Sequence, residues 1–292
     1  MAAELARRGI GPGDVVALTL PSTSAWVVAY VAAAKVGATT AGVNPRLTPV
    51  EQAAWQERVA PSLVLADADE VAALAIAGAQ PGALEPDDER PVAIVFTSGT
   101  TGLPKGAWFT DRQLRAVTAY DVGDAVGGEV AIPQYGATQF AHVGFTTKLP
   151  WYLRMGTTTH LLARWRAGRR AGPGGPRADR DPGWGRPQVA LMLRDPDFDR
   201  RDPELRAAAR DGRRRLAAGP GARGPPPLRA AYSIRWSSTE SGGVGTGTAR
   251  RPRRGAAQRR PGRPGMGVQV RGEDDLPLPH GEVGVVWLAP TP

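Results

Sequence analysis

Residues 92–107 constrain the fold of this chain more than any other stretch. They begin with five apolar residues, 92–96, a run that is too short for a helix and too unbroken for a half-solvated strand. We therefore expect a strand buried on both faces, as in a parallel sheet. The chain turns polar directly afterwards, with Thr97, Ser98, Gly99, Thr100, Thr101 and Gly102.

This polar loop, which ends at Lys105, has the composition of an anion-binding site. It offers four hydroxyl groups, and its glycines allow successive backbone N–H groups to point into one concavity. Lys105 adds an ammonium group, and Pro104 restricts the backbone before it. Phosphate is the anion that suits this composition best, although a surface turn rich in glycine and threonine would have the same composition.

The loop differs from the common nucleotide-binding P-loop, in which glycine precedes the lysine and serine or threonine follows it. Here Pro104 precedes Lys105 and Gly106 follows it. An apolar run at 107–109 and a capping box from Thr110 come next, which predicts a short strand and then a helix.

Upstream of the loop, segments typical of strands alternate with segments typical of helices. We expect strands at 15–20 and 62–65, and helices at 2–8, 24–35, 70–76 and from Thr48 onward. Thr48 begins a capping box with Glu51 and has proline at the next position, a pattern that favours a helix start. This alternation indicates an α/β domain with a mostly parallel sheet.

The composition excludes several kinds of site. The chain has no cysteine, so it can form neither disulfides nor a thiolate metal site. His142, His160 and His280 are scattered singly, which argues against zinc. No signal-peptide pattern is present, and the longest apolar run, 25–34, is shorter than the roughly 20 residues that span a bilayer. We expect a cytoplasmic protein without a membrane span.

The net charge of +9 is concentrated in three atypical segments, 164–187, 206–229 and 250–264. Each carries seven arginines, and together they contain only three acidic residues, so the rest of the chain is acidic. Glycine and proline recur in all three, and none has the periodicity needed to bury a face. We expect these segments to be disordered.

Three origins are open for these segments: disordered linkers, basic arms that bind nucleic acid, or translation of a GC-rich gene in a shifted reading frame. We favour the shifted frame, because the chain has 34 arginines against three lysines. Nucleic-acid binding is disfavoured because Trp165 and Trp184 are the only aromatic residues there that could stack on bases.

Residues 97–106, Thr-Ser-Gly-Thr-Thr-Gly-Leu-Pro-Lys-Gly, resemble the phosphate-loop signature of the adenylate-forming superfamily. This superfamily includes acyl-CoA synthetases, luciferases and peptide-synthetase adenylation domains, and residues 42–48 also resemble its acyl-CoA synthetases. The resemblance implies that the loop and Lys105 hold the polyphosphate of ATP. We call residues 97–105 the candidate phosphate loop.

Two further segments resemble elements of the same family. Trp236, Thr239 and Glu240 match its second nucleotide motif, with tryptophan where tyrosine is usual. The match implies that Trp236 stacks on adenine, that Thr239 donates to a phosphate oxygen and that Glu240 holds Mg²⁺. Phe140, His142 and Gly144 fit an element whose histidine or aromatic side chain gates the acyl pocket, although His142 could equally be a hydrogen-bonded loop residue.

The resemblance implies an incomplete large N-terminal domain, with a first βα subdomain at 1–90, the nucleotide and acyl site at 91–249 and a β-rich end at 266–292. The family's C-terminal domain, which carries a catalytic lysine, is expected to be absent. The implied activity is ATP- and Mg²⁺-dependent conversion of a carboxylic acid, preferably a fatty acid, to an acyl-adenylate and then, with CoA, to a thioester. We expect this activity to be impaired; the alternatives are a non-catalytic ATP-binding remnant and, less favoured, a basic nucleic-acid-binding protein.

Overall fold

The computed structural model describes residues 1–76, 78–97, 105–123, 134–136, 138–156, 158–161, 166, 190–191, 193–197, 200, 235–247 and 266–290. The chain divides into two units, which are described separately. The first unit is Met1–Leu161 together with Ser238–Val244, and the second is Leu162–Ser237 together with Gly245–Pro292. Residues 98–104, in the candidate phosphate loop, and all of the three arginine-rich segments except Arg166 lie outside the described residues.

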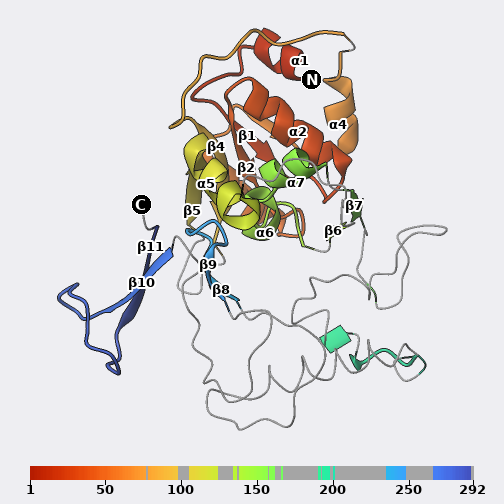
Figure 1. Cartoon of the computed structure of the whole chain (residues 1–292). Helices are drawn as coiled ribbons and strands as arrows, with labels where there is room; N and C mark the ends of the chain where they lie inside the picture. Colours follow the sequence, from red (N-terminus) through yellow and green to blue (C-terminus); the bar gives the residue numbers. More distant parts are fainter. Residues whose placement is uncertain are drawn as a thin grey trace. The chain divides into compact units, whose positions relative to one another are not determined.

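A five-stranded sheet with the order β3-β1-β2-β4-β5 forms the centre of the first unit (Figure 1). The strands are β1 (Val15–Leu18), β2 (Thr39–Gly42), β3 (Leu63–Leu65), β4 (Pro91–Phe96) and β5 (Gly106–Thr110). The first four are parallel, and β5 runs antiparallel to β4. This arrangement confirms the expected α/β class with a mostly parallel sheet.

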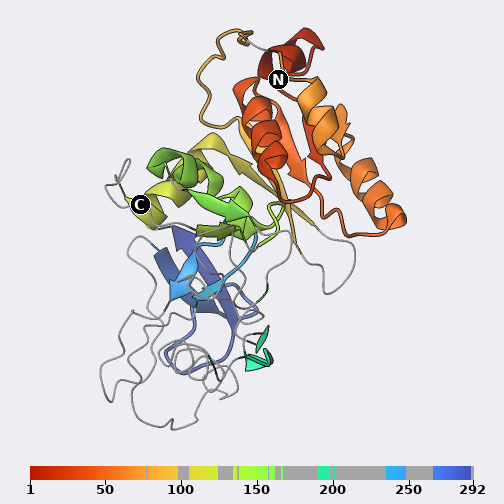
Figure 2. The same cartoon turned by 90° about the vertical axis from the view of Figure 1, so that its right-hand side faces the viewer.

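Helices lie on both sides of this sheet (Figures 1 and 2). They are α1 (Ala2–Arg7), α2 (Ser24–Lys35), α3 (Pro49–Val59), α4 (Ala68–Ala73), α5 (Asp111–Val122), α6 (Val143–Thr146) and α7 (Leu149–Met155). The main buried cluster joins α1, α2, α4, α6 and α7 to β1, β3 and β4. At its centre, Trp26 of α2 packs against Phe140 and Phe145.

The helix starts follow local sequence signals. The predicted capping boxes at Thr48 and Thr110 are both formed, each with the side chain of the third helical residue bonded back to the cap. Asp67 forms a third capping box with Glu70, which moves the start of α4 ahead of its expected position at residue 70. Because these boxes satisfy otherwise unpaired backbone groups, they fix the helix boundaries locally.

Strand β4 differs from the expectation of burial on both faces. Ala93 and Val95 are buried, whereas Val92, Ile94 and Phe96 are half-buried. Successive residues of a strand point to opposite faces, so one face of β4 belongs to the core and the other is only partly covered among the described residues. On the partly covered face, Phe96 contacts Trp55 of α3.

Short antiparallel pairs make up the described strands of the second unit. They are β8 (Arg235–Ser237) with β9 (Gly245–Gly247), and β10 (Met266–Arg271) with β11 (Val285–Pro290). The β10–β11 ribbon lies within residues 266–292, where a β-rich end was expected. The first unit also contains a parallel pair, β6 (Gln134–Gly136) with β7 (Thr159–Leu161). Among the described residues, none of the helices has the length and apolarity needed to cross a membrane.

Candidate functional site

The candidate phosphate loop begins and ends on neighbouring antiparallel strands. Phe96 at the end of β4 is paired with Gly106 at the start of β5, so the chain leaves and re-enters the sheet at the same place. The backbone N–H of Thr97 donates to the carbonyl oxygen of Lys105 over 2.9 Å, and the N–H of Lys105 donates to Oγ1 of Thr97 over 3.2 Å. These two predicted residues therefore form the base of the loop, with Lys105 exposed.

Five further loop residues predicted to bind nucleotide lie outside the described residues: Ser98, Gly99, Thr100, Thr101 and Gly102. Their roles stay predictions.

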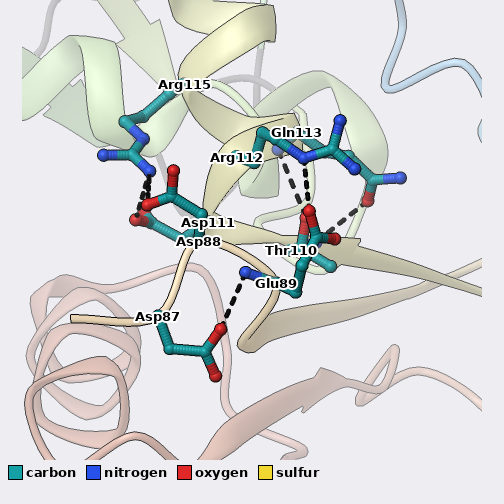
Figure 3. A network of polar contacts seen from close by, with 8 residues as sticks. All are labelled: Asp87, Asp88, Glu89, Thr110, Asp111, Arg112, Gln113 and Arg115. Atoms are coloured by element: carbon teal, nitrogen blue, oxygen red, sulfur yellow. Dashed lines mark hydrogen bonds and ion pairs between the residues drawn. The ribbon is translucent and has the colours of Figure 1, made fainter. Parts of the chain in front are cut away.

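Polar contacts attach the chain before β4 to the helix that follows β5. Asp88 pairs with Arg115, and Glu89 pairs with Arg112 (Figure 3). The backbone N–H of Asp111, the first residue of α5, also donates to the carbonyl oxygen of Arg90 over 3.0 Å. These contacts attach the acidic segment before β4 to the start of α5.

Thr239 and Glu240 lie in a tight turn, Ser238–Val244, that is assigned to the first unit although its sequence neighbours are not. Inside the turn, the N–H of Gly242 donates to the carbonyl oxygen of Thr239 over 3.0 Å, and that of Gly243 donates to Ser238 over 3.1 Å. Both glycines have positive φ, +66° and +73°, which other residues rarely adopt. Glu240 is exposed and Thr239 is half-buried.

Contacts with residues far away in sequence hold this turn in the first unit. A Cβ on Gly242 would lie 2.9 Å from Cγ2 of Val117 and 3.3 Å from Cε1 of Phe109. The hydroxyl of Thr147 donates to the carbonyl oxygen of Gly242 over 3.0 Å. The turn that carries Thr239 and Glu240 thus packs on β5 and α5, the elements that directly follow Lys105.

Trp236 and Thr239 belong to different units of the chain. Trp236 lies on β8 in the second unit, and its side chain is 40% exposed. An exposed indole is compatible with stacking on adenine, which stays a prediction.

His142 caps the start of α6. Its Nδ1 accepts a hydrogen bond from the backbone N–H of Gly144 over 3.0 Å. This bond requires an unprotonated Nδ1, so the neutral ring carries its proton on Nε2. Although the side chain is exposed, partial desolvation lowers the pKa of His142. The neutral imidazole can therefore donate a hydrogen bond to a ligand from Nε2.

Phe140 is a core residue. It is 1% exposed, stacks on Phe145 and packs against Trp26. Of the two residues proposed for gating, only His142 is accessible.

A buried ion pair that was not predicted from the sequence lies beside the turn. Nζ of Lys148, directly before α7, lies 2.6 Å from Oδ2 of Asp121 in the last turn of α5, and both side chains are nearly buried. A single lysine within the otherwise uncharged stretch 143–153 was the available signal.

Comparison with known proteins identifies the family of this chain. The sequence model described as "AMP-binding enzyme" matches residues 1–173, more than half of the chain. The chain belongs to the AMP-binding enzyme family. The resemblance to the adenylate-forming superfamily is thereby confirmed.

Curated relatives of this AMP-binding chain include several CoA ligases. "4-coumarate--CoA ligase 3" of Oryza sativa subsp. japonica is 33% identical over 150 residues, covering 41% of this chain and 27% of that protein. "Medium/long-chain-fatty-acid--CoA ligase FadD6" of Mycobacterium tuberculosis is 31% identical, covering 41% and 24%. The probable non-canonical nonribosomal peptide synthetase CymA of Salinispora arenicola is 32% identical, covering 46% and 2%. The chain thus matches less than a third of the length of each relative.

Solved structures confirm the fold of this AMP-binding chain. The N-terminal domain of FACL13 from Mycobacterium tuberculosis has a TM-score of 0.73 and 21% identity, covering 99% of this chain and 79% of that one. A putative long-chain-fatty-acid CoA ligase from Rhodopseudomonas palustris gives the same TM-score and identity, with 99% and 78% coverage. The fold is that of the large N-terminal domain of adenylate-forming enzymes.

Proposed function

We propose that this chain binds ATP and activates a carboxylic acid as part of an adenylate-forming acid–CoA ligase. The main supporting observation is the position of the Ser238–Val244 turn on β5 and α5, in the same unit as Thr97 and Lys105. Thr239 and Glu240 of the second predicted motif therefore belong to the same compact unit as Thr97 and Lys105, the described ends of the candidate phosphate loop.

The reaction consists of two displacements. A carboxylate oxygen of the acid attacks the α-phosphorus of ATP, the bond to the β-phosphate oxygen breaks, and pyrophosphate leaves. The sulfur of CoA then attacks the acyl carbon of the adenylate, which releases AMP. The protein contributes mainly by holding the phosphates in line and by stabilising their charge.

Individual residues have distinct roles in this proposal. Lys105 and the candidate phosphate loop hold the β- and γ-phosphates, and Thr239 donates to a phosphate oxygen. Trp236 stacks on adenine. His142 lies beside the acyl pocket and donates from Nε2 to the incoming acid.

Glu240 suits Mg²⁺. Its carboxylate is exposed, and no described residue forms an ion pair or hydrogen bond with it. The described residues contain no cluster of three or more His, Cys, Asp or Glu that could form a metal cage. Magnesium is commonly held by one or two carboxylates together with substrate phosphates. When bound, it would neutralise charge on the phosphates.

We favour a fatty acid as the substrate. We choose 4-coumarate as the alternative acid to test, because the names of the relatives include both 4-coumarate and fatty-acid CoA ligases. Turnover by this chain alone is expected to be low. The arginine-rich segments fall within and just after the expected nucleotide and acyl site, and their composition does not support a packed core.

Pyrophosphate release with Mg²⁺, ATP and a panel of fatty acids and 4-coumarate tests the reaction, and ATP titration tests binding separately. Lys105→Ala and Glu240→Gln should weaken both, whereas Lys35→Ala, at the end of α2, is the matched control. ATP binding without pyrophosphate release would support a non-catalytic remnant. Absence of ATP binding, or equal effects of Lys105→Ala and Lys35→Ala, would reject the proposal.

A further inference from the structure

The ion pair between Lys148 and Asp121 joins α5 to the residue before α7, next to the Thr239–Glu240 turn. Asp121 belongs to the last turn of α5, and Lys148 is the residue before α7. Their side chains are 12% and 11% exposed, and the charged atoms lie 2.6 Å apart. Desolvation offsets much of the attraction in such a buried pair, so general stability is a weak reason for having it.

Both Lys148 and its neighbour contact the turn. Cε of Lys148 lies 3.8 Å from the position that a Cβ on Gly243 would take. The fully buried Thr147 donates its hydroxyl to the carbonyl oxygen of Gly242, a residue 95 positions later in the sequence. Two adjacent residues before α7 therefore meet two adjacent glycines of the turn.

Residues of α5 and α6 also contact the turn. Val117 of α5, one helical turn before Asp121, meets Gly242, and Val143, the first residue of α6, meets Gly243. A shift of α5 relative to α7 would change both sets of contacts at once. The Lys148–Asp121 pair is a polar contact that opposes this shift.

We propose that Lys148 and Asp121 are positioning residues that fix α5 against α7 and so hold Thr239 and Glu240 in place for the nucleotide. Neither residue is proposed to touch substrate. The pair acts through Gly242 and Gly243, whose N–H groups close the turn around Glu240. The expected effect on the nucleotide rests on the proposed function. The mechanical claim, that the pair holds the turn in place, can be measured without any activity.

Hydrogen exchange at the amides of Gly242 and Gly243 tests the mechanical claim. Lys148→Met retains the length of the side chain and removes its charge. It should speed exchange at these two amides by about tenfold through local opening, while the amides of Thr39 and Val43 in the parallel sheet remain protected. Arg115→Gln is the matched control, because it breaks exposed ion pairs on the same helix and should leave the turn unchanged.

A double variant, Lys148→Met with Asp121→Leu, covers the case in which the single variant does not fold, because replacing both charges with apolar groups is well tolerated. It should also show fast exchange at Gly242 and Gly243 with a protected sheet. Unchanged exchange at the two glycines in the folded variants, or an equal change in Arg115→Gln, would overturn the proposal.

The functional consequence is measured on the same variants. Loss of the pair should raise the KM for Mg²⁺–ATP more than it lowers kcat, since the geometry around Glu240 is loosened. If the unmodified chain does not bind ATP, the proposed function fails while the exchange result still decides whether the pair holds the turn. If ATP binds and the turn loosens without a change in this KM, the positioning role is refuted.

Discussion

Thr97 and Lys105 close the base of the candidate phosphate loop through two reciprocal hydrogen bonds. One bond joins the N–H of Thr97 to the carbonyl oxygen of Lys105, and the other joins the N–H of Lys105 to Oγ1 of Thr97. The side chain of Thr97 therefore sets the direction in which the backbone enters Lys105. The backbone bond from Thr97 to Lys105 extends the β4–β5 pairing by one step beyond Phe96 and Gly106.

Thr97→Val tests the value of this closure. The variant retains the shape of threonine and removes the hydroxyl acceptor, at a cost of about 0.5–1.5 kcal/mol for a lost hydrogen bond. Because the N–H of Lys105 can then bond to water, we expect the melting temperature to fall by no more than about 5 °C and ATP binding to weaken. Calorimetric titration of ATP measures the effect, and Thr97→Ser, which retains the hydroxyl, should bind like the unmodified chain. Equal affinity for Thr97→Val and the unmodified chain would contradict the role of this bond.

Gly242→Ala should destabilise the first unit more than Gly9→Ala. Both glycines have positive φ, +66° and +79°, so alanine strains the backbone at each by about 1–2 kcal/mol. A Cβ at Gly9 meets nothing within 4 Å, whereas one at Gly242 lies 2.9 Å from Cγ2 of Val117. The extra cost of overpacking is about 1–3 kcal/mol. Denaturant unfolding of both variants measures the difference, and equal destabilisation would show that the turn moves away from α5.

Features set by a few neighbouring residues were predictable from the sequence. Thr48 and Thr110 begin helices because the capping box needs only a side chain three residues away. The same pattern at Asp67 was present in the sequence and was missed. The partial exposure of β4 was not predictable, because it depends on what packs over Ile94 and Phe96 from distant segments.

The candidate site shows the same limit. Motif matching named Thr239 and Glu240, but sequence order could not show that they belong to a different unit from Trp236. Nor could it show that their turn packs on β5 and α5 through Gly242. The pair of Lys148 with Asp121 was missed because no local pattern joins the end of one helix to the start of another. Phe140 was named for the site, but it belongs to the core. An aromatic residue suits both roles, so the residue type alone could not distinguish them.

Glu4→Gln should make the stability of the first unit less sensitive to acid. Hydrogen bonds from Arg7 and Arg8 lower the pKa of Glu4 from its usual 4.5 to about 2. Because this pKa is depressed in the folded state, the contribution is present above about pH 4.5 and is lost as the pH falls toward 2. Unfolding measured across this range should show a smaller loss for Glu4→Gln than for the unmodified chain. The exposed residue Glu57 on α3 provides the control Glu57→Gln, which should retain the full loss.

His142→Asn separates the capping role of this residue from its role toward the acid. The lowered pKa means that the folded state binds the imidazole proton less tightly than the unfolded state, whose value is 6.5. The contribution of His142 to stability is therefore complete above about pH 6.5 and is lost as the pH falls through the lowered pKa. Asparagine can also cap a helix and does not titrate, so the variant should match the unmodified chain at about pH 8 and be less sensitive at about pH 5.5.

Kinetics of the same variant address the acyl pocket. If Nε2 of His142 donates to the incoming acid, His142→Asn should raise the KM for the acid and leave the KM for ATP unchanged. A cap alone predicts no change in either constant once the stability of the two chains is matched. A rise in the KM for ATP as well would mean that α6 has moved together with the Ser238–Val244 turn. Val143, the residue directly after His142, contacts Gly243 of that turn. The ratio of the two KM values therefore distinguishes a substrate contact from a structural effect.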